Sequence, residues 1–331
     1  FSVMIKIKLP LKIKSTGSYV PSIVVKNADL IKDIDTTEEW IEKKLGIKER
    51  RFTTSHECTS DLASKAGLKA INQANLKVDD IDLIIVATAT PDRIAPSTAC
   101  IVQEKIKAFN AAAFDISAVC SGFLFGFSIA SQYINFGTYK NILLIGADCF
   151  SKITDFNSSD AVFFGDGAGA VIMSPSEDSG ILSVKIYSDG RGKDNFTVLG
   201  GGSETPLNEK NINDKLNFFS MIGKNVYDTA TTVLPKAINE ALQESNLSID
   251  DIDLLIPHQP SIKTLIKTAE KIGLPWSKVM TNMDLYANTA GATVPLLLDQ
   301  VFRAGKIKKD DKILFAAVGS GWTYAVAIMQ W

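Results

Sequence analysis

Short apolar runs alternate with longer amphipathic segments along most of the chain. Four runs are apolar at nearly every position and too short for helices: 83–87, 142–145, 254–256 and 313–317. Such runs are typical of strands that are covered on both faces of a sheet. Between these runs lie segments such as 236–245 and 261–272, in which apolar residues recur at helical spacing. The pattern therefore predicts an α/β fold with mainly parallel sheets.

The two halves of the chain resemble each other. The stretch "NLKVDDIDLIIVATATP" begins at Asn75, and the similar stretch "NLSIDDIDLLIPHQP" begins at Asn246. The separation of these two asparagines is called the repeat spacing below. "NILLIGADC" from residue 141 and "KILFAAVGS" from residue 312 have the same separation. Two matches at one spacing indicate a duplication. We expect two similar α/β halves, residues 1–180 and 181–331, with the turn-rich segment 185–220 as a connection.

Composition narrows the classes of function. The 331 residues carry a net charge of −2, which gives no bulk attraction to nucleic acid or to an anionic membrane. Four cysteines and two histidines lie far apart, without the spacing of a metal site or of a secreted disulfide framework. No stretch is a credible membrane-spanning helix, and residues 1–21 read as a strand. We expect a cytoplasmic globular protein without a metal.

One cysteine stands at a junction that suits chemistry. In "AAFDISAVCSGFLFGFSIA", Cys120 follows a short strand and opens an apolar helix. Free N–H groups at a helix start favour a thiolate and can hold an oxyanion. The alternative is a small buried hydrophobe, which is our interpretation of the other three: Cys58, Cys100 and Cys149. The repeat spacing places Gly291 at the point that corresponds to Cys120.

Two polar residues follow apolar runs in the second half. His258 comes directly after "DLLIP", at the C-terminal end of a strand, where α/β folds place groups that contact ligands. Asn288, in "DLYANTAGATVP", precedes a turn of small residues. A lone histidine is more often structural, and an asparagine at a turn is usually a cap. His56 lies in a polar stretch that reads as a surface loop.

With these residues the chain resembles the thiolase-like condensing enzymes. Among them it is most similar to the β-ketoacyl-ACP synthase III family, whose members start bacterial fatty-acid synthesis. The resemblance covers essentially the whole chain. It is carried by "STGSYVP" at 15–21, "TTEEWIEKKLGIKER" at 36–50, "VATATPDRIAPSTAC" at 86–100, "DISAVCSGF" at 115–123, "FGDGAGAV" at 164–171, "IPHQ" at 256–259 and "ANTAGATVPL" at 287–296.

The resemblance implies a fold, a reaction and a set of roles. The fold is the thiolase-like one, two duplicated halves in five αβαβα layers. The family's Cys-His-Asn triad falls on Cys120, His258 and Asn288. An acyl group from acyl-CoA is carried by the cysteine and condensed with decarboxylating malonyl-ACP, without a metal or a redox cofactor. A homodimer is also implied. The remaining implied contacts are the backbone N–H groups of Cys120 and Ser320 as oxyanion hole, and Thr36, Trp40, Lys44 and Gly223 for CoA.

The chain also departs from the family pattern. Lys44 and Ser158 stand where arginines usually grip CoA, so a carrier protein is an alternative acyl donor. Ala95 replaces a phenylalanine that closes the acyl pocket across the dimer in acetyl-specific members, which predicts a primer larger than acetyl.

Smaller departures lie closer to the triad and on the following helix. Ser320 and Trp322 alter a glycine-rich turn, and Pro260 removes an N–H beside His258. Lysines recur every four residues after the histidine, on one helical face. The resemblance implies that Lys263 docks the acidic carrier protein, and a solvated helical face is the alternative for all three lysines, Lys263, Lys267 and Lys271.

Other interpretations stay open to different degrees. Chain-elongating ketosynthases need two histidines after the cysteine, and thiolases need a second, later cysteine, so neither fits. A related enzyme of secondary metabolism that joins two acyl units or transfers an acyl group is the alternative. A silent partner subunit is disfavoured because the whole triad is present.

Overall fold

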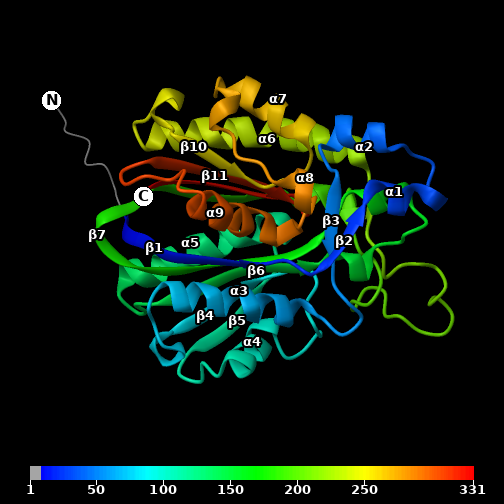
Figure 1. Cartoon of the computed structure of the whole chain (residues 1–331), viewed down its shortest axis with the longest axis horizontal. Helices are drawn as coiled ribbons and strands as arrows, with labels where there is room; N and C mark the ends of the chain where they lie inside the picture. Colours follow the sequence, from blue (N-terminus) through cyan, green and yellow to red (C-terminus); the bar gives the residue numbers. More distant parts are fainter. Residues whose placement is uncertain (1–8) are drawn as a thin grey trace.

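The structure is a computed structural model that describes residues 9–331 (Figure 1). Its strands are β1 (Leu9–Tyr19), β2 (Ile23–Lys26), β3 (Glu49–Phe52), β4 (Leu83–Ala87), β5 (Ala112–Ile116), β6 (Ile142–Cys149), β7 (Asp166–Ser188), β8 (Phe196–Thr197), β9 (Ser220–Met221), β10 (Leu254–Pro257), β11 (Lys312–Gly319) and β12 (Thr323–Gln330). Its helices are α1 (Asn27–Leu30), α2 (Glu38–Leu45), α3 (Thr59–Gln73), α4 (Thr98–Ile106), α5 (Gly122–Phe136), α6 (Gly223–Glu244), α7 (Ile262–Ile272), α8 (Met283–Tyr286) and α9 (Thr293–Arg303). The predicted N-terminal strand is β1, and the part of it before Leu9 lies outside the described residues.

Helices and sheet alternate in five layers, as Figure 1 shows. One apolar core joins α3 and α4 to the outer face of β4, β6 and β7, and another joins α6 and α7 to β10, β11 and β12. The third and largest core surrounds α5 and α9, which lie in the middle of the molecule between the two sheet regions. The αβαβα arrangement that the family resemblance implies is therefore confirmed.

The duplication is visible element by element. The first residues of β4 and β10 are separated by the repeat spacing, and so are the first residues of α5 and α9. The short 3₁₀ turns that precede these two helices, Val119–Ser121 and Ala290–Ala292, keep the same spacing. Their first residues share an unusual backbone conformation, with φ of 46° at Val119 and 48° at Ala290. The two halves thus retain the same local geometry where the sequence predicts chemistry.

The division at residues 180 and 181 falls inside β7. The first part of this strand, residues 166–173, pairs with β6, and residues 180–188 pair with β12. One continuous strand therefore contributes to both sheet regions and joins them into an eight-stranded sheet. The stated halves stay a prediction.

The prediction of mainly parallel sheets is wrong. β4 pairs with β5 and β6 in parallel, and β10 pairs with β11 in parallel. However, β7 is antiparallel to β1, β6 and β12, and β11 is antiparallel to β12. The turn between β11 and β12 is only three residues long, which permits an antiparallel pair but no parallel crossover.

One helix is longer than the sequence pattern suggested. α6 starts at Gly223 rather than near residue 236, because it continues through Pro235 towards the N-terminus. The expected connection at 185–220 begins only after β7 ends at Ser188. In the part of the chain that the structure describes, no helix has the length and apolar character needed to cross a bilayer.

Candidate active site

A cavity of about 310 Å³ lies between residues of the two halves. Eight of the predicted site residues line it: Trp40, Lys44, Cys120, Gly223, His258, Lys263, Asn288 and Ser320. Trp40 is 43% exposed and Cys120 is 7% exposed, so they mark its outer and inner parts. Thr36 lies in an adjoining hollow that shares Trp40 and Gly223. Ala95 lies on an exposed loop and does not line the cavity of its own chain.

Cys120 lies on a strained turn at the start of α5. The preceding residue, Val119, has φ of 46°, which a β-branched residue rarely adopts. The end of β11 packs directly against this turn, and a Cβ atom on Gly319 would lie 3.0 Å from the Cys120 nitrogen. Only glycine allows so close an approach. Ser320, the next residue, lines the same cavity as Cys120.

The Cys120 thiol is protonated at neutral pH. Burial raises its pKa, and the nearby carboxylate of Asp148 raises it further. This direction is opposite to the shift expected from the helix start, because the loss of water raises the pKa more than the N–H groups lower it. Chemistry at this sulfur needs a base.

His258 is held at the end of β10, facing the cavity. Its backbone N–H donates to the Ala316 carbonyl at 2.8 Å, which extends the pairing of β10 with β11. The ring is buried, and burial lowers the pKa to about 3, so the imidazole is neutral. Nδ1 lies 2.7 Å from Oγ1 of Thr293. Nε2 is therefore the ring nitrogen available to a bound substrate.

Asn288 presents its amide nitrogen to the cavity. Its Oδ1 accepts a hydrogen bond of 2.8 Å from the Ala290 N–H, which assigns the orientation of the amide. The backbone is tied to the segment before β7, since Asn288 N donates to Phe163 O at 3.1 Å and Gly165 N donates to Asn288 O at 3.0 Å. With Oδ1 occupied, the Nδ2 hydrogens are the part of the amide that can bind a ligand oxygen.

Comparison with known proteins decides the family. The sequence profile described as 3-oxoacyl-[acyl-carrier-protein (ACP)] synthase III matches residues 114–190, and that of its C-terminal part matches residues 242–331. A β-ketoacyl-[acyl-carrier-protein] synthase III of Clostridioides difficile is 45% identical over 96% of this chain and 98% of its own length. The chain belongs to the β-ketoacyl-ACP synthase III family. Members of this family are acyl-transferring condensing enzymes.

Solved structures agree. The 3-oxoacyl-[acyl-carrier-protein] synthase III of Aquifex aeolicus superposes with a TM-score of 0.90 at 36% identity, covering 97% of this chain and 100% of the other. The priming β-ketosynthase of the R1128 polyketide pathway has a TM-score of 0.89 at 28% identity, covering 100% and 99%. The thiolase-like fold expected from the resemblance is confirmed.

An aromatic cluster surrounds the cysteine of this family member. Phe150 and Phe164 stack with ring centroids 4.4 Å apart, and Phe196 and Phe219 stack at 5.5 Å. All four rings belong to one apolar cluster with Cys120. Sequence reasoning missed this set because the four residues come from separate segments and share no periodic pattern. Two of the four, Phe164 and Phe196, line the cavity and make its inner part apolar, as an acyl chain requires.

Asp148 is a second group that sequence reasoning missed. Its Oδ1 accepts hydrogen bonds from Thr88 Oγ1 at 3.1 Å, Ala89 N at 2.8 Å and both Thr90 N and Oγ1 at 3.1 and 2.9 Å. Its Oδ2 accepts one from Gly291 N at 2.8 Å. Burial raises its pKa to about 6, while these five donors favour the carboxylate. Asp148 thus ties the loop after β4 to the turn before α9.

The three lysines of α7 have different surroundings. Lys263 lies at the cavity, and the ammonium of Lys44 beside it lowers its pKa. Lys267 forms an ion pair of 3.2 Å within its own helix, and Lys271 donates to a backbone carbonyl of α6 at 2.7 Å. Two cations therefore face each other at the outer part of the cavity, a setting that favours an anionic ligand.

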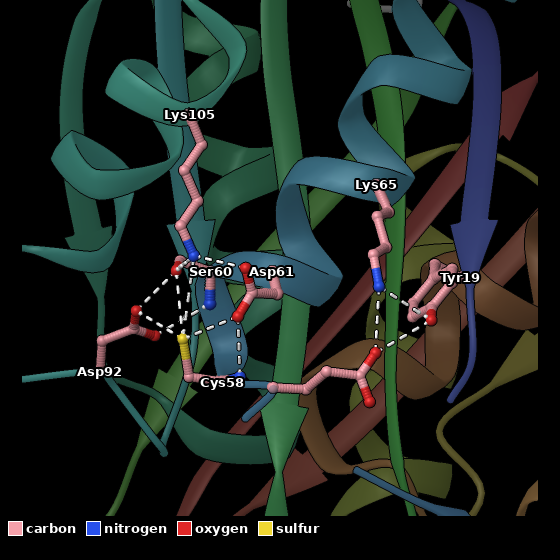
Figure 2. A network of polar contacts seen from close by, with 8 residues as sticks. Tyr19, Cys58, Ser60, Asp61, Lys65, Asp92 and Lys105 are labelled. Carbon is pink, nitrogen blue, oxygen red and sulfur yellow. Dashed lines mark hydrogen bonds and ion pairs between the residues drawn. The ribbon is translucent and has the colours of Figure 1, made fainter. Parts of the chain in front are cut away.

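The remaining thiols lie away from the cavity. Figure 2 shows that Cys58 belongs to a polar cluster at the start of α3, so the interpretation of this residue as a buried hydrophobe is wrong. Its Sγ lies 3.1 Å from a carboxylate oxygen of Asp61 and 3.1 Å from one of Asp92, either of which can accept its single proton, and Lys105 pairs with Asp61 at 2.6 Å. Burial and these two carboxylates raise the pKa of Cys58, which disfavours the reactive thiolate. A second contact in Figure 2 joins Lys65 and Tyr19 at 2.9 Å.

The other minor candidates fit their expected roles more closely. Cys149 is buried at the end of β6, as a small apolar side chain. Cys100 is half-buried on α4. His56 is exposed in the loop before α3, away from the cavity.

Proposed function

We propose that this protein condenses an acyl primer, delivered as acyl-CoA, with malonyl-ACP through an acyl-enzyme on Cys120. The observation that supports this most is the meeting of a thiol, a neutral imidazole and a free amide nitrogen in one apolar cavity, from Cys120, His258 and Asn288. Family membership supports the same reaction. The site would then catalyse the condensation that starts fatty-acid synthesis.

Acylation begins with the neutral thiol. The proton leaves Sγ of Cys120 for Nε2 of His258 as the sulfur attacks the thioester carbonyl carbon. The oxygen that becomes negative accepts hydrogen bonds from the backbone N–H groups of Cys120 and Ser320, which the contact of Gly319 with the Cys120 nitrogen holds together. The bond to the CoA sulfur breaks, and the CoA thiolate takes the proton from Nε2. His258 returns to its neutral form.

Condensation uses the same three side chains. Malonyl-ACP places its thioester carbonyl against Nδ2 of Asn288 and Nε2 of His258, and this ring nitrogen takes up a proton from solvent as the malonyl carboxylate enters. The malonyl carboxylate is an anion that stabilises this imidazolium. Loss of CO₂ leaves an enolate, whose oxygen the two donors stabilise and whose carbon attacks the acyl group on Cys120. The sulfur leaves as a thiolate and takes the proton from Nε2. The product is β-ketoacyl-ACP.

The outer part of the cavity suits a phosphopantetheine arm. Trp40 offers a half-exposed aromatic face, and Lys44 and Lys263 offer two close cations for a phosphate. Thr36 and Gly223 lie beside Trp40 and complete the proposed CoA contacts. Lys263 is also our candidate for docking the acidic carrier protein. Lysines in place of arginines leave an acyl carrier protein as an alternative donor.

A homodimer would complete the acyl pocket. β5 ends one edge of the large sheet and pairs only with β4 among the described residues. On the neighbouring loop Ile94 is 92% exposed, next to Ala95. We propose that a second copy covers this edge and places its Ala95 at the cavity. The small side chain leaves room for several methylenes, each stabilising the bound primer by about 0.8 kcal/mol. The preferred primer is then larger than acetyl.

We also propose that the reaction needs no metal or redox cofactor and takes place in the cytoplasm. Each proposed step uses only side chains and backbone N–H groups of this chain. Between residues 9 and 331 no group of three or more histidines, cysteines and acidic residues is arranged to hold a metal ion. A low net charge of −2 supports a freely diffusing protein without a nucleic-acid partner.

Product analysis tests the proposed function. The protein is incubated with an acyl-CoA of graded length and malonyl-ACP, and the mass of the carrier protein and the released CO₂ are measured. We expect one β-ketoacyl-ACP and one CO₂ for each primer consumed. A product made from two acyl-CoA molecules, with the carrier protein unchanged, would support the alternative of secondary metabolism, which no observation on this chain favours.

A further inference from the structure

The imidazole of His258 is bonded to a hydroxyl whose own proton has another acceptor. Nδ1 lies 2.7 Å from Thr293 Oγ1, and Oγ1 donates to the Ala290 carbonyl at 2.9 Å. A hydroxyl carries one proton, and a carbonyl oxygen can only accept. With that proton directed to Ala290, Oγ1 can only accept from the ring. The hydrogen on the imidazole therefore resides on Nδ1.

The neighbouring backbone does not compete for Nδ1. Pro260, two residues after the histidine, has no N–H, and the N–H of His258 itself is bonded to Ala316. Thr293 is fully buried as the first residue of α9, next to the turn Ala290–Ala292 that corresponds to the Cys120 turn. Its hydroxyl is thus the group that orients the ring.

We infer that Thr293 is a positioning residue that holds His258 as the Nδ1–H tautomer, so that Nε2 presents a lone pair to the cavity and accepts the proton of Cys120 during acylation. This inference rests on the proposed function. In that step the S–H bond breaks, a bond from Nε2 to the proton forms, and the sulfur electron pair forms the new bond to the acyl carbon. Nδ1–H keeps its bond to Oγ1 throughout, which stabilises the transient imidazolium. The opposite tautomer would direct N–H at the thiol and could not act as its base.

The tautomer is read directly by ¹⁵N NMR of the full-length protein labelled only at histidine. The chain has two histidines, and the exposed His56 serves as an internal reference once assigned with a His56→Gln variant. In the substrate-free protein we expect a pyrrole-type Nδ1 and a pyridine-type Nε2 for His258. A pyrrole-type Nε2 in the wild-type protein would overturn the inference.

Variants of the threonine separate position from packing. Thr293→Val keeps the shape and loses the hydroxyl, whereas Thr293→Ser keeps the hydroxyl. We expect the first to shift His258 towards the Nε2–H tautomer and to slow acylation about 10-fold or more, within the range of general base catalysis. The serine variant should recover the wild-type tautomer and most of the rate.

Thr268→Val is the matched control, since Oγ1 of this buried threonine has no hydrogen-bond partner among the described residues. It should leave both the tautomer and the acylation rate unchanged. An unchanged tautomer and rate in a folded Thr293→Val protein would overturn the inference. The NMR experiment needs no substrate, so it tests the tautomer of His258 independently of the reaction. An unexpected tautomer would overturn this inference, whereas a failure to acylate Cys120 would overturn the proposed function.

Discussion

The carboxylate of Asp148 accepts a hydrogen bond of 2.8 Å from the N–H of Gly291. At the repeat spacing Gly291 corresponds to Cys120 and Gly319 corresponds to Asp148, so this contact corresponds to the one between Gly319 and Cys120. In the first half of the duplication, the side chain of Asp148 accepts a hydrogen bond from the N–H of Gly291 in the other half. In the second half, Gly319 has no side chain that could bond the Cys120 N–H. The proposed oxyanion site thus belongs to the Cys120 turn, since the Gly291 N–H is already bonded to Asp148.

Asp148→Asn should destabilise the fold. The amide oxygen can replace Oδ1, but the NH₂ group would then face the Gly291 N–H, and two donors would meet in a buried site. We expect the free energy of unfolding to fall by about 3 kcal/mol, as for other broken buried charged networks. Urea unfolding followed by tryptophan fluorescence measures it. The exposed Asp178→Asn should change the value by less than about 0.5 kcal/mol. A loss below about 1 kcal/mol for Asp148→Asn would contradict the account.

Alkylation of Cys120 should depend steeply on pH. Burial and Asp148 raise the thiol pKa above its ordinary value, and His258, with a pKa of about 3, carries no charge that would offset this. The thiolate fraction then rises about tenfold for each pH unit from 6 to 9. Iodoacetamide rates at the Cys120 peptide, measured by mass spectrometry beside N-acetylcysteine, test this. A plateau below pH 7 would mean that a thiolate and imidazolium pair exists in the free protein.

Gly319→Ala should disable the oxyanion site. Its Cβ would lie 2.9 Å from the Ala118 oxygen and 3.0 Å from the Cys120 nitrogen, so the turn must move. We expect the rate of acylation to fall about 100-fold or more, the usual effect of losing one oxyanion donor. Gly190→Ala is the matched control, because its Cβ would meet no atom within 4 Å. Stopped-flow release of CoA measures both, and equal rates for the two variants would refute the proposed oxyanion hole.

Much of the fold was predictable from the sequence because strand patterns are local. The run at 83–87 coincides with β4. The repeat spacing also correctly identifies β10 as the strand of the second half that corresponds to β4. Strand direction was not predictable from the same pattern. An apolar run is buried on both faces in either orientation, and only the connection lengths determine which one forms.

Some residues of the site were also predictable from the sequence, and others were not. Cys120, His258 and Asn288 each follow a predicted strand or precede a predicted turn, so sequence motifs identify them, and they do line one cavity. Thr293 and Asp148 act through contacts between distant segments, and burial alone sets the protonation of the thiol. The repeat offered one unused signal, since it aligns Asp148 with a glycine in a half that has a different chemical role.

Ala95→Phe should shorten the preferred primer. If Ala95 of a second copy leaves the acyl pocket open, the wild-type protein turns over primers of about 6 to 10 carbons faster than acetyl-CoA, since each added methylene gains about 0.8 kcal/mol. A phenylalanine should reverse this order by filling the same space. Turnover across an acyl-CoA series measures both proteins. Refusal of the longer primers by the wild-type protein, with good use of acetyl-CoA, would contradict the proposal.

The most direct test of the central claim is the intact mass of the protein after brief incubation with an acyl-CoA. The account predicts one added acyl group, located by peptide mapping at Cys120, absent from Cys120→Ala and lost with CO₂ release when malonyl-ACP is added. Thr268→Val should carry the same adduct as the wild type. An adduct that survives in Cys120→Ala, or no adduct with any acyl-CoA or acyl-ACP, would contradict the assignment of Cys120 as the acyl carrier.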